Sequence, residues 1–233
     1  MKQSLILSIE TSGAACSVAL AKGGVVEGSV TIDDSNRQSS MLVPAIESLF
    51  KQCSRKMSEC DAVAVSSGPG SYTGLRVGVS TAKGMCYGLG KPLISVPTLE
   101  ILLAEAMSLE QCAGADYFVP MLDARRMEVY QAVYGADGRC VEEVSAKVLD
   151  AGSYADLLEK GRVAFIGTGA RKYADAFPHP NGIYVPNVPK AGFMSVAAQA
   201  AYDAERFEDV AYFEPFYLKE FVAIVKKNPI NIS

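Results

Sequence analysis

Histidine is almost absent from this sequence of 233 residues, which contains a single one, His179, between Pro178 and Pro180. A metal site built on a pair of histidines is therefore excluded, because one ring supplies one imidazole ligand. A catalytic role would have to rest on that one ring or on no imidazole at all. Because a lone histidine between two prolines is typical of a surface loop, we expect His179 to be neither a catalytic residue nor a metal ligand.

An excess of basic residues is lacking too. The chain has 22 Lys and Arg residues against 26 Asp and Glu residues, a formal net charge of −4. Proteins that bind nucleic acid unaided usually carry a positive surplus, because neutralising phosphates supplies much of their affinity. A free-standing nucleic-acid binder is therefore disfavoured, although the chain can still contact RNA within a complex whose partner carries the positive charge.

Paired cysteine motifs and long hydrophobic runs are also missing. The six cysteines are scattered without a CxxC pair, and the apolar stretches are far shorter than a membrane span. No cleavable signal peptide is recognisable after Met1. We therefore expect a cytoplasmic protein whose reduced cysteines pack as small apolar side chains, with no association with a membrane.

What the sequence does contain is ordinary for a folded α/β protein, with 49% hydrophobic and 21% charged residues. The first part of the chain predicts three antiparallel strands followed by alternating helices and strands, and hence a mixed sheet with helices on its faces. Proline is tolerated in a helix mainly in the first turn, so Pro44 predicts that the first helix begins near Ser40 or Met41. The expected strands are residues 5–9, 16–20, 25–31, 61–66 and 93–96, and the expected helices end near residues 51, 89 and 107.

The second part of the chain predicts another sheet. A hairpin turn over 135–138 separates two of its strands, and an Ala-rich helix follows late in the sequence. The expected strands are residues 117–123, 127–134, a strand from 140, and 163–166, and the expected helix is 195–206. We place the division within 109–116, which gives an N-terminal half of residues 1–108 and a smaller C-terminal half of residues 109–233, whose last helix packs back on the first half.

A small polar loop lies between the first two expected strands. Thr11, Ser12 and Gly13 are residues whose backbone N–H groups can face an anion, so they are a candidate phosphate loop. A plain hairpin turn explains the same residues more simply, because short motifs of this kind occur often by chance.

A glycine-rich segment, Gly68–Gly74, lies between an expected strand and the start of the second helix. It could form an anion site at the helix start, although it lacks the GK[ST] of a Walker A loop, or a rigid turn at a subunit boundary. Within the helix, Gly74, Gly78 and Ala82 form a stripe of small residues that lets another helix approach closely. The spacing alone does not decide whether that helix belongs to this chain or to another.

Two further groups of residues could carry chemistry. The segment 123–128, Asp-Ala-Arg-Arg-Met-Glu, places acidic and basic groups beside a hairpin, and a turn with exposed charges and an internal salt bridge explains it as well. Aromatic residues gather near the end of the chain, where packing is a simpler explanation than a stacking platform. They are Tyr212, Phe213, Phe216, Tyr217 and Phe221.

Taken together, these motifs resemble the TsaB (YeaZ) family, partner proteins in the threonylcarbamoyladenosine modification of tRNA. The matches cover most of the chain and are densest over the first 134 residues. They are the segments 7–12 (LSIETS), 15–20 (ACSVAL), 66–78 (SSGPGSYTGLRVG), 82–84 (AKG), 97–100 (PTLE) and 123–130 (DARRMEVY).

The resemblance implies an actin-like ASKHA (ribonuclease H-like) fold of two related halves, each a mixed sheet flanked by helices. It also implies a cytoplasmic tRNA-processing protein that is a non-catalytic scaffold or activating partner of TsaD. That transferase forms N6-threonylcarbamoyladenosine at position 37 of tRNAs that read ANN codons. The implied partners are TsaD in a heterodimer, the ATPase TsaE, and a second copy of the chain when it is alone, with tRNA contacted indirectly or weakly.

Two departures from related proteins support the non-catalytic role. The transferase holds a metal through histidines on its first long helix, whereas residues 37–44 contain none, and Ser39 and Met41 are not imidazole ligands. Position 10 is Glu where the family usually has Asp, and the extra methylene carries the carboxylate further into the candidate phosphate loop. We therefore expect that the chain itself requires no cofactor, with ATP or ADP at a complex interface left open.

The resemblance and the small-residue stripe together predict a partner surface on the helices 41–51 and 74–89. Its expected residues are Met41, Ile46, Phe50, Ser71, Gly74, Leu75, Gly78 and Ala82. On this prediction, Gly78→Arg abolishes association and leaves the monomer folded. The alternatives are a nucleotide-responsive regulator of the same complex, or a metal-dependent peptidase-like or kinase-like enzyme.

Overall fold

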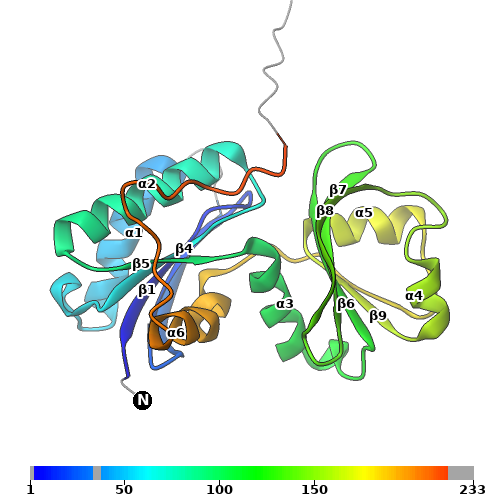
Figure 1. Ribbon diagram of the computed structural model, residues 1–233, viewed down its shortest axis with the longest axis horizontal. Coiled ribbons are helices and arrows are strands. Elements are labelled where there is room, and N and C mark those ends of the chain that lie inside the picture. The colour runs from blue at the N-terminus through cyan, green and yellow to red at the C-terminus, as the bar shows by residue number, and fades with distance from the viewer. Residues whose placement is uncertain (1–2, 34–37, 220–233) are drawn as a thin grey trace, which may run out of the picture.

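The computed structural model describes residues 3–33 and 38–219, which form two five-stranded sheets with helices on their faces (Figure 1). The first sheet and its helices comprise β1 (Leu5–Glu10), β2 (Cys16–Lys22), β3 (Val25–Ile32), α1 (Gln38–Gln52), β4 (Ala62–Ser66), α2 (Tyr72–Leu89) and β5 (Leu93–Val96). There follow α3 (Thr98–Ser108), β6 (Tyr117–Asp123), β7 (Glu128–Gly135), β8 (Cys140–Val148), α4 (Ala155–Lys160), β9 (Val163–Ile166), α5 (Thr168–Ala176), β10 (Gly182–Val185) and α6 (Ser195–Asp203). Three short 3-10 helices are η2 (Met57–Glu59), η3 (Glu110–Cys112) and η4 (Ala191–Met194).

The two sheets repeat one topology. The first has the strand order β3-β2-β1-β4-β5, and the second, taken in the matching direction, has the order β8-β7-β6-β9-β10. In each sheet the first three strands along the chain pair antiparallel, and the last two are added in parallel. The chain therefore consists of two related halves, as predicted.

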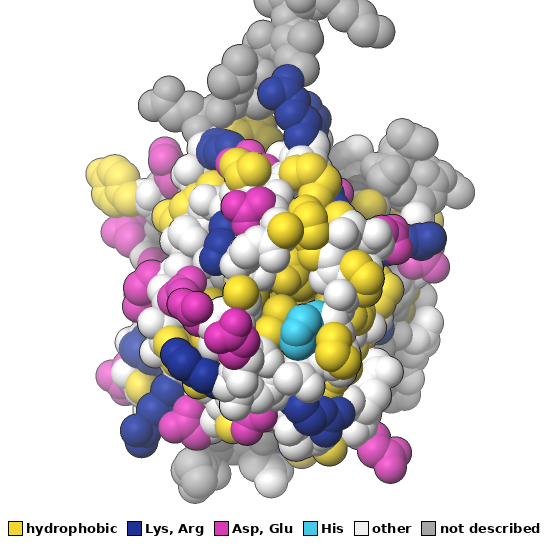
Figure 2. Space-filling model, turned by 90° about the vertical axis from the view of Figure 1, so that its right-hand side faces the viewer, with side chains coloured by type: hydrophobic (Ala, Val, Ile, Leu, Met, Phe, Trp, Pro, Cys, Tyr) yellow, Lys and Arg dark blue, Asp and Glu magenta, His cyan; other side chains and the backbone are white. Residues whose placement is uncertain are grey.

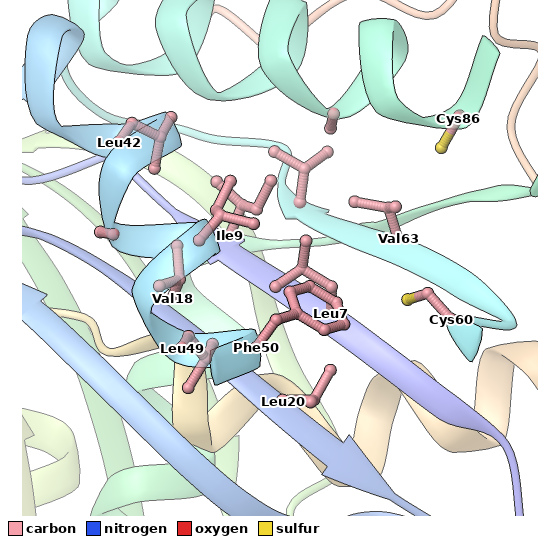
Figure 3. Packing of buried hydrophobic residues seen from close by; sticks show 14 of the residues in the cluster. Leu7, Ile9, Val18, Leu20, Leu42, Leu49, Phe50, Cys60, Val63 and Cys86 are labelled. Carbon is pink, nitrogen blue, oxygen red and sulfur yellow. The ribbon is translucent and has the colours of Figure 1, made fainter. Parts of the chain in front are cut away.

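The first sheet is covered on both faces. Every residue of β1 and β4 is buried, which is typical of central strands between two helical layers. α1 and α2 pack on one face, where Figure 3 shows side chains of α1, among them Leu42 and Phe50, meeting those of β1 and β2. α6 and η4 pack on the other face, through Met194 and Ala198.

The second sheet is covered by α3 on one face and by α4 and α5 on the other. Helix α3 contacts both halves, because Leu99 and Leu102 lie in the core of the second sheet whereas Ile101 lies in a core of the first. The expected division after residue 108 thus follows a helix shared by the two sheets, and the division itself stays a prediction.

Several local predictions need correction. Pro44 lies in the second turn of α1, not the first, because the helix already includes Gln38. Three elements of the second half, α4, α5 and β10, were not predicted, and α6 ends at Asp203 rather than near Arg206. No helix in residues 3–33 and 38–219 is long and apolar enough to cross a membrane.

A C-terminal strap, residues 207–219, returns across the first half (Figure 1). It pairs with the edge strand β5 at Leu93, and Phe213 joins the core beneath α1 and α2. Tyr217 packs on Tyr72, with ring centroids 4.6 Å apart. Packing is therefore confirmed as the role of Phe213 and Tyr217, whereas Tyr212 is 83% exposed and Phe221 lies outside the described residues.

Candidate functional site

The candidate phosphate loop after β1 is closed by the chain's own carboxylate. Glu10 is fully buried, and its Oε1 accepts hydrogen bonds of 2.5 Å from both the backbone N–H and the hydroxyl of Ser12. Thr11 N donates to Ser66 Oγ over a longer distance of 3.4 Å. The prediction that the Glu10 carboxylate reaches into this loop is thus confirmed, and it occupies donors that an external anion would need.

Burial also changes the ionisation of this loop. Desolvation raises the pKa of the Glu10 carboxyl above its ordinary value of 4.5, and the hydrogen bonds from Ser12 act in the opposite direction. Glu10 Oε2 and Thr11 Oγ1 are buried without a hydrogen-bond partner among the described residues. Proton uptake at Glu10 is therefore favoured relative to a solvated carboxyl.

The glycine-rich segment is what packs against this loop. Ser71 N donates to Ser12 O over 2.7 Å, and Ser71 Oγ caps α2 by accepting from Gly74 N. A Cβ atom at Gly74 would lie 2.0 Å from Thr11 O, and one at Gly78 would lie 2.1 Å from Thr11 Oγ1. Gly74 and Gly78 of α2 therefore face the β1–β2 loop inside this chain, and no second helix is needed to explain them.

This packing corrects the choice of contact residues. Six of the eight residues expected at the partner surface are buried within the chain: Ile46, Phe50, Gly74, Leu75, Gly78 and Ala82. Of the other two, Met41 is half-buried and Ser71 is exposed. Arginine at Gly78 would collide with Thr11, so the expectation that Gly78→Arg leaves the monomer folded is wrong.

The outward side of α1 and α2 carries different residues. Val43 of α1 is 51% exposed and Tyr87 of α2 is 88% exposed. A Cβ atom at Gly84 or Gly88 would meet no described atom within 4 Å, and Val77 and Met85 are half-buried nearby on α2. Residues 77, 84 and 88 recur at helical spacing and so share one side of α2. The sequence could have identified that side as the outward one only if the buried side had been known.

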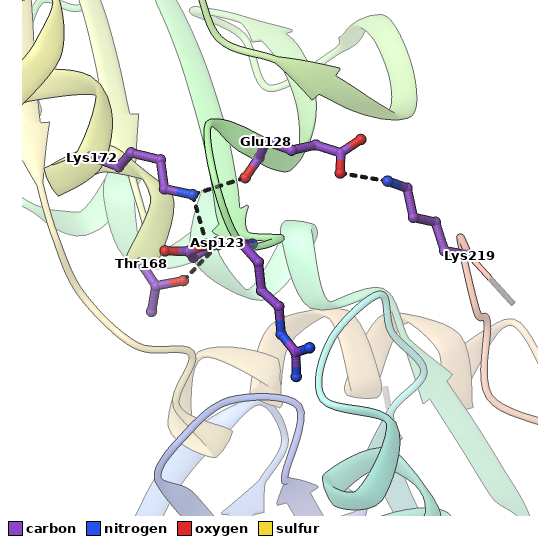
Figure 4. Close-up of polar contacts among 6 residues, drawn as sticks. Asp123, Glu128, Thr168, Lys172 and Lys219 are labelled. Atoms are coloured by element: carbon purple, nitrogen blue, oxygen red, sulfur yellow. Dashed lines mark hydrogen bonds and ion pairs between the residues drawn. The ribbon is translucent and has the colours of Figure 1, made fainter. Parts of the chain in front are cut away.

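The equivalent loop of the second half is an ionic turn (Figure 4). Asp123 Oδ1 accepts from Arg125 N at 2.6 Å and from Lys172 Nζ at 2.7 Å, and Asp123 N donates to Thr168 Oγ1. Lys172 also donates to the carbonyl of Glu128, whose carboxylate pairs with Lys219 of the strap. The predicted turn with exposed charges is confirmed, but the expected internal salt bridge is wrong, because both carboxylates pair with lysines outside the segment, Lys172 and Lys219.

A cleft of about 490 Å³ lies beside this turn, between the hairpin and one side of α5. Helix α5 was not predicted, although Gly167, Thr168 and Gly169 after a predicted strand were a signal for a helix start. The lining residues include Asp123, Met127, Thr168, Arg171, Lys172 and Asp175.

The single histidine belongs to neither loop. Figure 2 shows it on the end of the molecule formed by the second half, with apolar side chains around it. His179 N donates to the hydroxyl of Tyr184, and His179 Nδ1 accepts from Asn181 N. Among the described residues, no group of three or more His, Cys, Asp or Glu side chains is placed to hold a metal ion.

The repeated sheet order, with an acidic residue ending the first strand of each half, defines the class: an actin-like ASKHA protein. The solved structure of YeaZ from Pseudomonas aeruginosa superposes with a TM-score of 0.77 at 28% sequence identity, over 92% of this chain and 100% of that one.

Sequence comparison identifies the family. The model of the TsaD family, described as tRNA N6-adenosine threonylcarbamoyltransferase, matches residues 21–226. The tRNA threonylcarbamoyladenosine biosynthesis protein TsaB of Bacillus subtilis is 32% identical over 70% of both chains, and that of Haemophilus influenzae is 28% identical over 95% of this chain and 96% of its own. The chain belongs to the TsaB (YeaZ) family of tRNA threonylcarbamoyladenosine biosynthesis proteins, within the wider TsaD family.

Proposed function

We propose that this chain is a non-catalytic cytoplasmic partner of a TsaD-type threonylcarbamoyltransferase, which it activates by binding. The transferase, assisted by a TsaE-type ATPase, would modify adenosine 37 of tRNAs that read ANN codons. The observation that carries the proposal is the closed β1–β2 loop, where Glu10 and α2 occupy the space and the donors of a phosphate site.

The outward side of α1 and α2 is the surface we propose for the partner. It combines the exposed side chains of Val43 and Tyr87 with the open glycines Gly84 and Gly88, and glycine lets a partner's backbone approach closely. Exposed aromatic residues are favoured anchors at protein interfaces. The same surface would support a homodimer when the transferase is absent.

Reconstitution tests the proposal directly. Threonylcarbamoyl-adenylate, tRNA, the transferase and the ATPase from the same organism are incubated with and without this chain, and modified adenosine is quantified by mass spectrometry. We expect modification to stop without the chain and to return when it is added. Turnover of ATP or of a peptide by the chain alone, lost on Glu10→Ala, would instead support the enzyme alternative.

A nucleotide-responsive regulator is the second candidate, favoured by the cleft beside Thr168 and Lys172. ATP or ADP bound in this cleft would then regulate the complex. Calorimetric titration of nucleotide into the chain alone and into its complex with the transferase separates the two. If neither the chain alone nor its complex shows a heat of nucleotide binding, the result supports a scaffold that does not respond to nucleotide.

A further inference from the structure

The turn between β6 and β7 has an unusual backbone. Arg125 and Arg126 are consecutive and both adopt positive φ, of 71° and 48°. Left-handed backbone costs about 1–2 kcal/mol per residue for side chains other than glycine. The turn nevertheless presents two exposed arginines, so the guanidinium groups give a reason for this backbone.

Neither Arg125 nor Arg126 is neutralised by a neighbouring carboxylate among the described residues. Each carboxylate near the turn already has a basic partner: Asp123 with Lys172, Glu128 with Lys219, and Asp175 with Arg171. No described residue forms an ion pair with either Arg125 or Arg126. The patch therefore has five cations against three carboxylates, on a chain whose net charge is −4.

The base of the turn is held rigidly. Ala124 N donates to the carbonyl of Glu128, Glu128 N donates to the carbonyl of Arg125, and Asp123 is fixed by Thr168 and Lys172. The backbone from which both arginine side chains extend is thus fixed by hydrogen bonds, and a guanidinium can bind a phosphate through two parallel hydrogen bonds.

We propose that the Arg125–Arg126 turn binds the phosphate backbone of RNA. Two adjacent exposed guanidinium groups suit a polyanion, because each can neutralise a separate phosphate, and the open cleft beside them leaves room for a nucleotide unit. That the RNA is the tRNA substrate rests on the proposed function. The turn would thus add a small cationic contact to a complex in which the partner supplies most of the positive charge.

The test compares two double variants of equal charge in the complex with the transferase. Arg125→Asn with Arg126→Asn removes both guanidinium groups and introduces a residue type that tolerates positive φ, so the melting temperature should not fall. Arg139→Asn with Lys160→Asn removes two exposed cations elsewhere on the second half. Binding of fluorescent tRNA is measured by anisotropy at several salt concentrations, and complex formation is checked by size-exclusion chromatography.

We expect the turn variant to weaken tRNA binding on the order of tenfold and to lower the slope of log K against log salt by about two, since each phosphate contact contributes about one. The control should behave as wild type. Equal weakening by both variants, or none by the turn variant, would overturn the proposal. So would unchanged tRNA binding together with lost ATP binding, which would assign the turn to a nucleotide. Because tRNA binding is measured without catalysis, failure here is distinct from failure of the reconstitution.

Discussion

The β1–β2 loop and the β6–β7 loop occupy equivalent places in the two halves, and both follow a strand that ends in an acidic residue. In each, the carboxylate accepts from the N–H two residues later, Ser12 in one and Arg125 in the other. The first carboxylate is fully buried beneath a glycine-lined helix, whereas the second is partly exposed and pairs with lysine. The same topology thus supports a sealed loop in one half and a charged, open one in the other.

The largest effect should come from filling the glycine contact of the sealed loop. Gly74→Ala places a Cβ atom 2.0 Å from the carbonyl oxygen of Thr11, which is backbone and cannot move aside easily. We expect a loss of about 3 kcal/mol or more in the free energy of unfolding, measured with urea. Gly169→Ala in α5 is the matched change in the open half, where the nearest atom is a side-chain methyl of Val129 at 2.8 Å. A smaller loss in the free energy of unfolding is expected for Gly169→Ala. Equal losses for the two variants would contradict the difference between the sealed loop and the open one.

The ionic turn of the second half should respond to loss of its lysine. Lys172→Met removes the hydrogen bonds to Asp123 and to the Glu128 carbonyl from a side chain that is only 15% exposed. We expect the free energy of unfolding to fall by about 1–2 kcal/mol. Arg171→Met, on the same helix with a side chain that is 79% exposed, should change it by less than about 0.5 kcal/mol. Similar values for the two variants would show that the turn is not held by Lys172.

The buried carboxyl of Glu10 predicts that the stability of the fold depends on pH. Because the pKa of Glu10 is raised in the folded state, the folded chain binds this proton more tightly than the unfolded chain. Its contribution to stability is therefore present at low pH and is lost as the pH rises above about 4.5, with a slope of at most about 1.4 kcal/mol per pH unit. Thermal unfolding of wild type and Glu10→Gln across pH 4–8 measures the difference. Parallel pH profiles of the two proteins would show that the pKa of Glu10 is not raised by folding.

The smallest effect is expected at the strap. Lys219→Ala removes an ion pair to Glu128 from a lysine whose side chain is 47% exposed. Such a pair contributes about 0.2–1 kcal/mol. Urea unfolding at low and high salt should show a loss confined to low salt. A loss that persists at high salt would mean that the strap holds the second half by more than this charge pair.

Sequence patterning was sufficient for elements whose apolar residues decide their structure. The run Val163–Ile166 is a short, fully buried strand and was predicted at its observed bounds. Helix α5 was missed because it has few large apolar side chains, with one strongly buried aromatic, Tyr173. Positive φ at Arg125 and Arg126 was not predictable, because neither residue type favours it.

The candidate site was only partly accessible to such reasoning. The glycine-rich segment could be singled out from the sequence, but helical spacing does not say which neighbour a small residue accommodates. The neighbour is the Thr11 loop, brought to α2 by the pairing of β1 with β4. Tertiary packing, and not local pattern, decides that Gly78 is internal whereas Gly84 is open.

Affinity for the TsaD-type transferase is the most direct test of the proposed scaffold. Gly84→Arg on the open side of α2 is compared by calorimetry with Gly152→Arg, the same change on an exposed turn of the second half. We predict that Gly84→Arg weakens association at least about tenfold without lowering the melting temperature, and that Gly152→Arg binds as wild type. Wild-type affinity of the Gly84→Arg variant would contradict the account.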